Sequence, residues 1–111
     1  MAPMASLTVQ QAKRIIIEEL EQAGCSARRV LLFGSRAKGT AHPDSDWDLY
    51  VIINEDLPHS ERWNLSDRIR RRFVQAGFRG DVFIQSEAVV QARKDNTGYL
   101  TYHALKEGIE I

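Results

Sequence analysis

The sequence has few of the residues that define secreted or membrane-spanning proteins. Cys25 is the only cysteine among 111 residues, so no internal disulfide can form, which favours a reducing compartment or a small buried thiol. The longest apolar runs, such as Leu49 to Ile53, are far too short to cross a bilayer, and Met1 to Met4 lack the basic residues of a signal peptide. The sequence therefore predicts a soluble cytoplasmic protein with no membrane association.

Net charge is also missing. Fifteen lysines and arginines balance fifteen acidic residues, which gives a formal net charge of zero. No overall field draws the molecule to nucleic acid, so any affinity for phosphate has to come from a local cluster. We therefore expect no direct binding to nucleic acid.

Length and pattern indicate one domain over residues 1–111, with no repeat, linker or low-complexity segment. The hydrophobic periodicity and turn residues predict an α/β (α+β) fold, in which helices flank a small mixed β-sheet. Thr8 and Gln11 form a potential capping box for the first helix, and Gly24 is expected to end it. The expected elements are a helix over 9–23, a strand over 30–33, helical turns over 35–39, turns over 40–45, a strand over 46–53, a helix from 58 or 60 to 76, a strand over 81–84, and helices over 86–94 and 99–107.

A glycine-serine pair follows the first predicted strand. Gly34 and Ser35 stand between that strand and a helical turn, where backbone amides and a hydroxyl can point together at a phosphate. Most such pairs only change the direction of the chain. The pair therefore needs support from other residues.

That support comes from acids at the starts of apolar strands. Asp46 and Asp48 project to the same face of a strand, because strand side chains alternate, and Asp81 opens the next strand. Carboxylates this close repel one another unless a cation neutralises them or water solvates both. The run that follows Asp48 is apolar, which favours the cation. Hard oxygen ligands suit Mg²⁺ or Mn²⁺ together with the phosphates of a nucleoside triphosphate, and three such acids fit a two-metal transfer site.

A calcium loop is the alternative metal site. Asp44, Asp46 and Asp48 fit its first, third and fifth positions, and Glu55 fits its twelfth. However, the sixth position requires glycine, and Leu49 stands there at the start of an apolar strand. The strand therefore argues against a calcium loop.

The segments Gly34-Ser35-Arg36-Ala37-Lys38-Gly39 and Ser45-Asp46-Trp47-Asp48-Leu49 together resemble the signature of the DNA polymerase β-like nucleotidyltransferase superfamily. The short chain is similar to the minimal nucleotidyltransferases, including the MntA-type antitoxins that are paired with HEPN-domain toxins. The resemblance implies that Gly34 and Ser35 hold the triphosphate and that Asp46 and Asp48 bind metal. Asp81 matches the third acid of the family.

The resemblance also implies an activity, in which AMP passes from ATP to an acceptor hydroxyl, above all a tyrosine of a cognate HEPN toxin. Arg36 and Lys38 flank the turn and could neutralise pyrophosphate, or they could simply be solvated. The chain lacks the additional domain of larger relatives, which suggests that a partner or a second copy in a homo-oligomer completes the pocket. The rival hypothesis is a non-catalytic antitoxin or scaffold that neutralises its partner by binding alone.

Other residues have simpler interpretations. Arg68, Arg71 and Arg72 lie away from the apolar stripe of their helix and are interpreted as a solvated face. Trp47 and Trp63 are expected to be core or interface anchors. The three histidines share no metal-ligand spacing.

Overall fold

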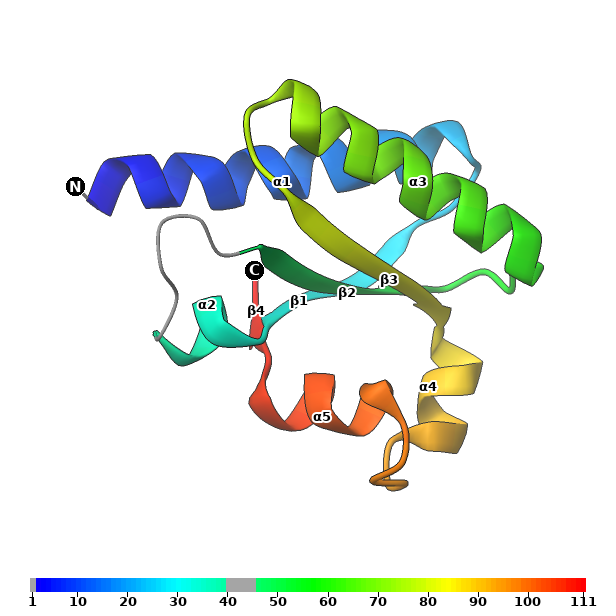
Figure 1. Cartoon of the computed structure of the whole chain (residues 1–111). Coiled ribbons are helices and arrows are strands. Elements are labelled where there is room, and N and C mark those ends of the chain that lie inside the picture. The colour runs from blue at the N-terminus through cyan, green and yellow to red at the C-terminus, as the bar shows by residue number, and fades with distance from the viewer. Residues whose placement is uncertain (1, 40–45) are drawn as a thin grey trace.

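Helices and strands alternate along the chain as the sequence pattern predicts (Figure 1). The structure is a computed structural model that describes residues 2–39 and 46–111, so the turns expected at 40–45 lie outside the described residues. The elements are α1 (Ala2–Gln22), β1 (Ala27–Phe33), α2 (Ser35–Lys38), β2 (Trp47–Ile53), α3 (His59–Gln75), β3 (Gly80–Ser86), α4 (Glu87–Arg93), α5 (Leu100–Glu107) and β4 (Ile109–Glu110).

The strands form one mixed sheet in the order β3-β2-β1-β4. Strand β1 is antiparallel to β2 and β4, whereas β2 and β3 are parallel. Parallel neighbours need a crossover connection, and α3 provides it. The predicted mixed sheet with flanking helices is confirmed. Strand β4 was missed because two residues carry no measurable periodicity.

Helices cover both faces of the sheet, with α1 and α3 on one face and α4 and α5 on the other (Figure 1). Leu49 and Val51 belong to the core cluster under α1 and α3, whereas Tyr50 and Ile52 belong to a second cluster on the opposite face. Strand β2 is therefore buried on both faces, which explains its almost uninterrupted apolar sequence. This central strand carries Asp48, the second of the three acids that the sequence singles out.

The first helix begins earlier than its local signals predict. Helix α1 starts at Ala2, so Thr8 lies inside it and the capping box with Gln11 is wrong. Pro3 does not prevent this start, since proline is tolerated in the first helical turn. The predicted end is confirmed by Gly24, which has a φ of 76°, and Cys25 is a buried free thiol. Within the described residues, no helix is long and apolar enough to cross a membrane.

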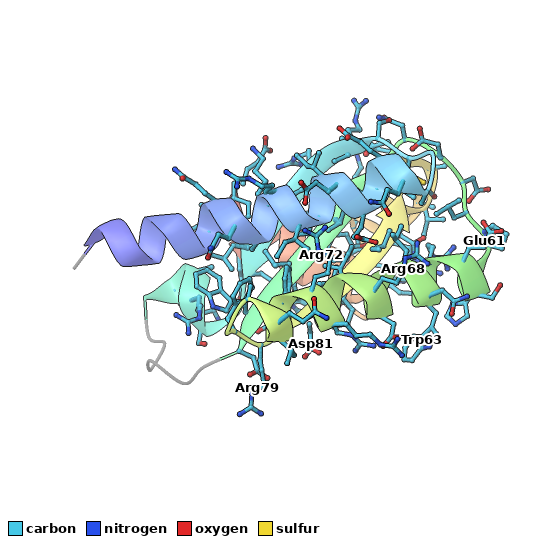
Figure 2. All side chains as sticks on the ribbon, turned by 90° about the horizontal axis from the view of Figure 1, so that it is seen from above. Glu61, Trp63, Arg68, Arg72, Arg79 and Asp81 are labelled. Carbon is cyan, nitrogen blue, oxygen red and sulfur yellow. The ribbon has the colours of Figure 1, made fainter. Side chains whose placement is uncertain are left out.

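An ion-pair network joins α1 to α3. Arg72 lies 2.7 Å from a carboxylate oxygen of Glu18 and 3.2 Å from Glu19, and Arg68 lies 3.3 Å from Glu19. The Glu19 side chain is only 8% exposed, so these guanidiniums neutralise a buried charge. The interpretation as a solvated face is therefore incomplete for Arg68 and Arg72, which are partly exposed but also bridge the two helices, as Figure 2 shows. Arg71, at 75% exposure, does lie on the solvated side.

Candidate functional site

The turn after β1 depends on a glycine. Gly34 has a φ of 74° and immediately precedes α2, which begins at Ser35. A Cβ atom at position 34 would collide with the carboxylate oxygen Oδ2 of Asp48. Glycine is thus needed both for the left-handed backbone and for the close approach of the turn to Asp48. The glycine-serine turn and an acid of strand β2 lie side by side.

Asp48 and Asp81 are neighbours in the sheet. The parallel register pairs Asp48 with Asp81, and the antiparallel register pairs Asp48 with Phe33, the last residue of β1. Each acid is the second residue of its strand. Side chains that are paired in register point to the same face of a sheet, so the two carboxylates share one face. The turn, Asp48 and Asp81 consequently lie across three adjacent strands.

The three acids affect one another electrostatically. Partial burial raises the pKa of Asp48, and the negative charges of Asp81 and Asp46 raise it further. Asp46 itself is exposed and immediately precedes β2. The three acids that the sequence singles out are therefore gathered at one end of the sheet, where their charges repel one another.

An arginine that the sequence analysis did not single out stands beside Asp81. The Nη1 atom of Arg70, on α3, lies 3.9 Å from Oδ1 of Asp81, and its Nη2 atom lies 3.7 Å from Asp67. The Asp81 side chain remains 53% exposed. Arg70 was missed because it stands among several arginines, and only the packing of α3 on β3 brings it to the acid.

The two cations that follow the turn contact protein groups. The guanidinium carbon of Arg36 lies 4.3 Å from the centre of the Trp47 ring, and Nζ of Lys38 lies 3.3 Å from a carboxylate oxygen of Glu107. Trp47 is buried, as expected for a core anchor, whereas Trp63 is 59% exposed. The Lys38 and Glu107 side chains are both largely exposed, so their pairing is weak and exchangeable.

The donor chemistry of the site suits a metal that arrives with a substrate. Within residues 2–39 and 46–111, no group of three or more His, Cys, Asp or Glu side chains is arranged to hold a metal ion. Mg²⁺ often uses one or two protein carboxylates and completes its octahedron with phosphate oxygens and water. Asp48 and Asp81, with Asp46 nearby, could supply those carboxylates.

The calcium-loop alternative does not fit the fold. Leu49, at the position that requires a turn-forming glycine, is fully buried in strand β2. Glu55 follows the far end of that strand, where its carboxylate accepts hydrogen bonds from the backbone amide and the hydroxyl of Ser26 at 2.8 and 3.0 Å. The seven residues of β2 separate Glu55 from Asp46, so the two acids cannot surround one ion. Asp44 lies outside the described residues.

A mixed sheet with acids at the starts of two parallel strands, next to a glycine-serine turn, is the arrangement of a nucleotidyltransferase domain. A family model described as "Polymerase beta, Nucleotidyltransferase" matches residues 14–111, and the chain belongs to this family. The resemblance drawn from the two sequence motifs is thereby confirmed. A search of curated protein sequences finds no match.

Solved structures of toxin–antitoxin complexes contain chains with a similar fold. One is a mutant MntA-HpeT complex, with a TM-score of 0.58, 22% identity, and coverage of 89% of this chain and 70% of that chain. A second is a tri-AMPylated Shewanella oneidensis HEPN toxin in complex with MNT antitoxin (TM-score 0.56, 19% identity, coverage 91% and 69%). A third is a toxin–antitoxin with AMP-PNP (TM-score 0.54, 22% identity, coverage 87% and 69%). At these identities the likeness shows the fold.

Proposed function

We propose that this chain is an Mg²⁺-dependent nucleotidyltransferase that transfers AMP from ATP to an acceptor hydroxyl. The observation that carries the proposal is the order of three groups across adjacent strands. Gly34 follows β1, Asp48 lies on β2, and Asp81 lies on β3. This order would place metal-binding acids between the triphosphate at the turn and an acceptor beyond Asp81, where metal ions can stabilise the attacking and leaving oxygens of an in-line displacement at phosphorus.

The triphosphate would lie at the turn. Backbone amides after Gly34 and the Ser35 hydroxyl can donate hydrogen bonds to the β- and γ-phosphates. Lys38 could exchange its exposed contact with Glu107 for a phosphate oxygen, and Arg36 is two residues closer to the turn. The α-phosphate would then lie over Asp48.

The transfer step needs a group that accepts the acceptor's proton. The acceptor oxygen forms a bond to the α-phosphorus while the bond from that phosphorus to the bridging oxygen of the β-phosphate breaks, and pyrophosphate leaves. Asp81 is the proton acceptor in this proposal, because its exposed carboxylate lies on the strand beyond Asp48. Mg²⁺ or Mn²⁺ ions held by Asp46, Asp48 and Asp81 would neutralise the triphosphate and favour the alkoxide.

A tyrosine of a HEPN-domain toxin is the acceptor that we propose. The support is the fold shared with chains of toxin–antitoxin complexes, one of which contains an AMPylated HEPN toxin. In this proposal the chain is the antitoxin of the pair and acts by modifying its partner. The rival is an antitoxin that neutralises its partner by binding only.

Labelled ATP distinguishes an antitoxin that transfers AMP to its partner from one that only binds it. The purified chain is incubated with Mg²⁺ and the protein product of a neighbouring gene, tested as the candidate HEPN-domain partner, using ATP labelled on either the α- or the γ-phosphate. Transfer of AMP puts the α-label, but not the γ-label, on the partner, and the Tyr→Phe variants of the partner identify the acceptor. A stable complex that carries neither label would support the binding-only antitoxin and contradict the proposed activity.

A further inference from the structure

A cleft of about 550 Å³ opens beside Asp81, outside the turn that would hold the triphosphate. It runs along β3, the outer strand of the sheet, between α3 on one side and the α4–α5 segment on the other. Asp81 lines one part of it, and Trp63 lines another. Figure 2 shows both residues on the side of α3 that faces away from α1.

The cleft carries much of the exposed apolar surface of the described residues. Trp63 is 59% exposed, Phe83 and Tyr99 are each 41% exposed, and Leu100 is 38% exposed. All four line the cleft, whereas Val74 and Ile109, the other large apolar side chains that the described residues expose, do not. Large apolar groups gathered in a concave surface are typical of a binding site, because isolated ones scatter over a protein surface.

The charges of the cleft are mainly positive. Arg62, Arg70 and Arg93 line it together with a single acid, Asp81. The guanidinium of Arg70 lies 5.4 Å from the centre of the Trp63 ring, and that of Arg93 lies 4.5 Å from the centre of the Tyr99 ring. Among the ion pairs of the described residues, none includes Arg62 or Arg93. The cleft therefore has positive charge that an incoming acidic group could neutralise.

Arg70 makes this surface continuous with the acids. The guanidinium of Arg70 lies 3.9 Å from Asp81 and also covers the Trp63 ring. A molecule that packs on Trp63 is therefore next to Asp81. The cleft is on the side of Asp81 away from the turn, because β3 is the outer strand and Gly34 follows β1. This is the side from which an acceptor would approach the α-phosphate.

We propose that the cleft along β3 binds the acceptor, and that the acceptor is a segment of a partner protein with acidic and apolar side chains around the reacting hydroxyl. This inference rests on the proposed function. Apolar groups of the segment would pack on Trp63 and Leu100, its acidic groups would pair with Arg93 and Arg62, and its hydroxyl would reach Asp81. The segment would bind to side chains of the cleft rather than to the backbone of β3, because the Val82 carbonyl of β3 already accepts a hydrogen bond from Ser66 Oγ at 2.6 Å.

A protein segment fits the cleft better than RNA. The guanidiniums of Arg70 and Arg93 already cover one face of Trp63 and of Tyr99, which reduces the ring surface available for stacked bases. The chain has no net positive charge, so no broader field would hold a phosphate backbone. Side chains from Phe83 and Leu100 instead offer an apolar lining of the kind that protein interfaces use.

Two synthetic peptides test the proposal. Both contain a central tyrosine flanked by leucines, and their outer residues are glutamates in one and lysines in the other. Fluorescence anisotropy should show that the wild type binds the glutamate peptide about tenfold or more tightly than the lysine peptide. Arg93→Glu should abolish or reverse this preference, whereas Arg71→Glu, a charge reversal at an exposed position of α3 outside the cleft, should leave it unchanged.

The contribution of apolar contacts to peptide affinity can be tested with a matched control. Trp63→Ala should weaken binding of the glutamate peptide by about tenfold, as expected for an interface tryptophan, and Val74→Ala should not change it. Both residues are exposed on α3, so each variant is expected to remain folded, and thermal melts check this. The affinity for Mg·ATP should stay within about threefold of wild type in all four variants.

Several outcomes would overturn the proposal. The cleft is not an acidic-segment site if the wild type binds the two peptides equally or binds neither, or if single-stranded RNA binds more tightly and depends on Trp63. A tenfold loss of Mg·ATP affinity in Trp63→Ala would make the cleft a nucleoside site instead. AMP transfer to a partner whose KM is unchanged by Arg93→Glu and Trp63→Ala refutes the cleft but leaves the proposed function intact. Conversely, selective peptide binding without any AMP transfer supports the cleft and refutes the proposed function.

Discussion

Replacing Gly34 with alanine tests the geometry of the site without changing any charge. Gly34 has a φ of 74°, and a Cβ atom there would collide with Oδ2 of Asp48. Gly24 offers a matched control, because its φ is 76° and an added Cβ would meet nothing within 4 Å. Both substitutions place alanine at a positive φ, although Gly34 also has an extended ψ of −155°, and only Gly34→Ala displaces the acid.

The two variants are expected to lose different amounts of unfolding free energy, because only Gly34→Ala disturbs the contact with Asp48. A positive φ costs an L-residue about 1–2 kcal/mol in the left-handed helical region and about 1–3 kcal/mol where ψ is extended, as at Gly34, and alanine recovers about 0.4–1 kcal/mol by restricting the unfolded chain. Gly24→Ala should therefore lower the free energy of unfolding by about 1 kcal/mol. In Gly34→Ala the short Asp48 side chain has to leave its position or β1 has to shift, which adds about 1–3 kcal/mol. The total expected for Gly34→Ala is about 2–5 kcal/mol.

Urea denaturation of a double-mutant cycle isolates that contact. In an Asp48→Ala background, Gly34→Ala should cost only about 1–2 kcal/mol, so the coupling energy should be about 1–3 kcal/mol. Titration with Mg·ATP should show a loss of about tenfold or more for Gly34→Ala and no change for Gly24→Ala. A coupling energy below about 0.5 kcal/mol would refute the close approach of the turn to Asp48.

Three further predictions concern the acids and their ligands. The pKa of Asp48 is raised in the folded state, so its contribution lowers stability as pH rises from its ordinary value of 3.8 through the raised pKa. In chelator at neutral pH, Asp48→Asn and Asp46→Asn should therefore have melting temperatures no lower than that of the wild type. For Asp48→Asn, the difference in melting temperature from the wild type should shrink towards pH 4. A melting temperature lower by several degrees in both variants would make these acids structural. Asp81→Asn should keep Mg·ATP affinity within a few-fold and slow single-turnover AMP transfer by about a hundredfold or more, and a near wild-type rate would remove Asp81 from the mechanism. ATP should raise the melting temperature only with Mg²⁺ or Mn²⁺, whereas strong stabilisation by micromolar Ca²⁺ alone would contradict the magnesium assignment.

The parts of the fold that depend on local chemistry could be predicted from the sequence. Gly24 and Gly77 end α1 and α3 because both have a positive φ, and the apolar run of β2 predicts a buried strand. The start of α1 could not be predicted, because the Thr8 capping signal is overridden by a helix that continues to Ala2. Strand β4 depends on pairing with β1, which local periodicity does not contain.

Some parts of the candidate site could likewise be predicted from the sequence, whereas others depend on long-range packing. The glycine-serine turn and the paired acids are visible as a motif, but the register that pairs Asp48 with Asp81 depends on how α3 returns the chain to the sheet. The contact between Arg70 and Asp81 and the cleft along β3 are long-range features too. They follow from the packing of α3 against β3, so no short segment of the sequence contains them.

The parallel pairing of β2 and β3 has a consequence for how the chain folds. Antiparallel β1 and β2 can pair as near neighbours, but β3 can join β2 only after the 17 residues of α3 have crossed the sheet. Closing such a long connection is entropically expensive and makes parallel contacts slow to form. By this reasoning Asp48 and Asp81 meet later than the residues that pair β1 with β2, and a chain in which β3 has not yet paired holds these acids apart. Under the proposed function, AMP transfer rather than nucleotide affinity would report the pairing of β3, because transfer needs Asp81 beside Asp48.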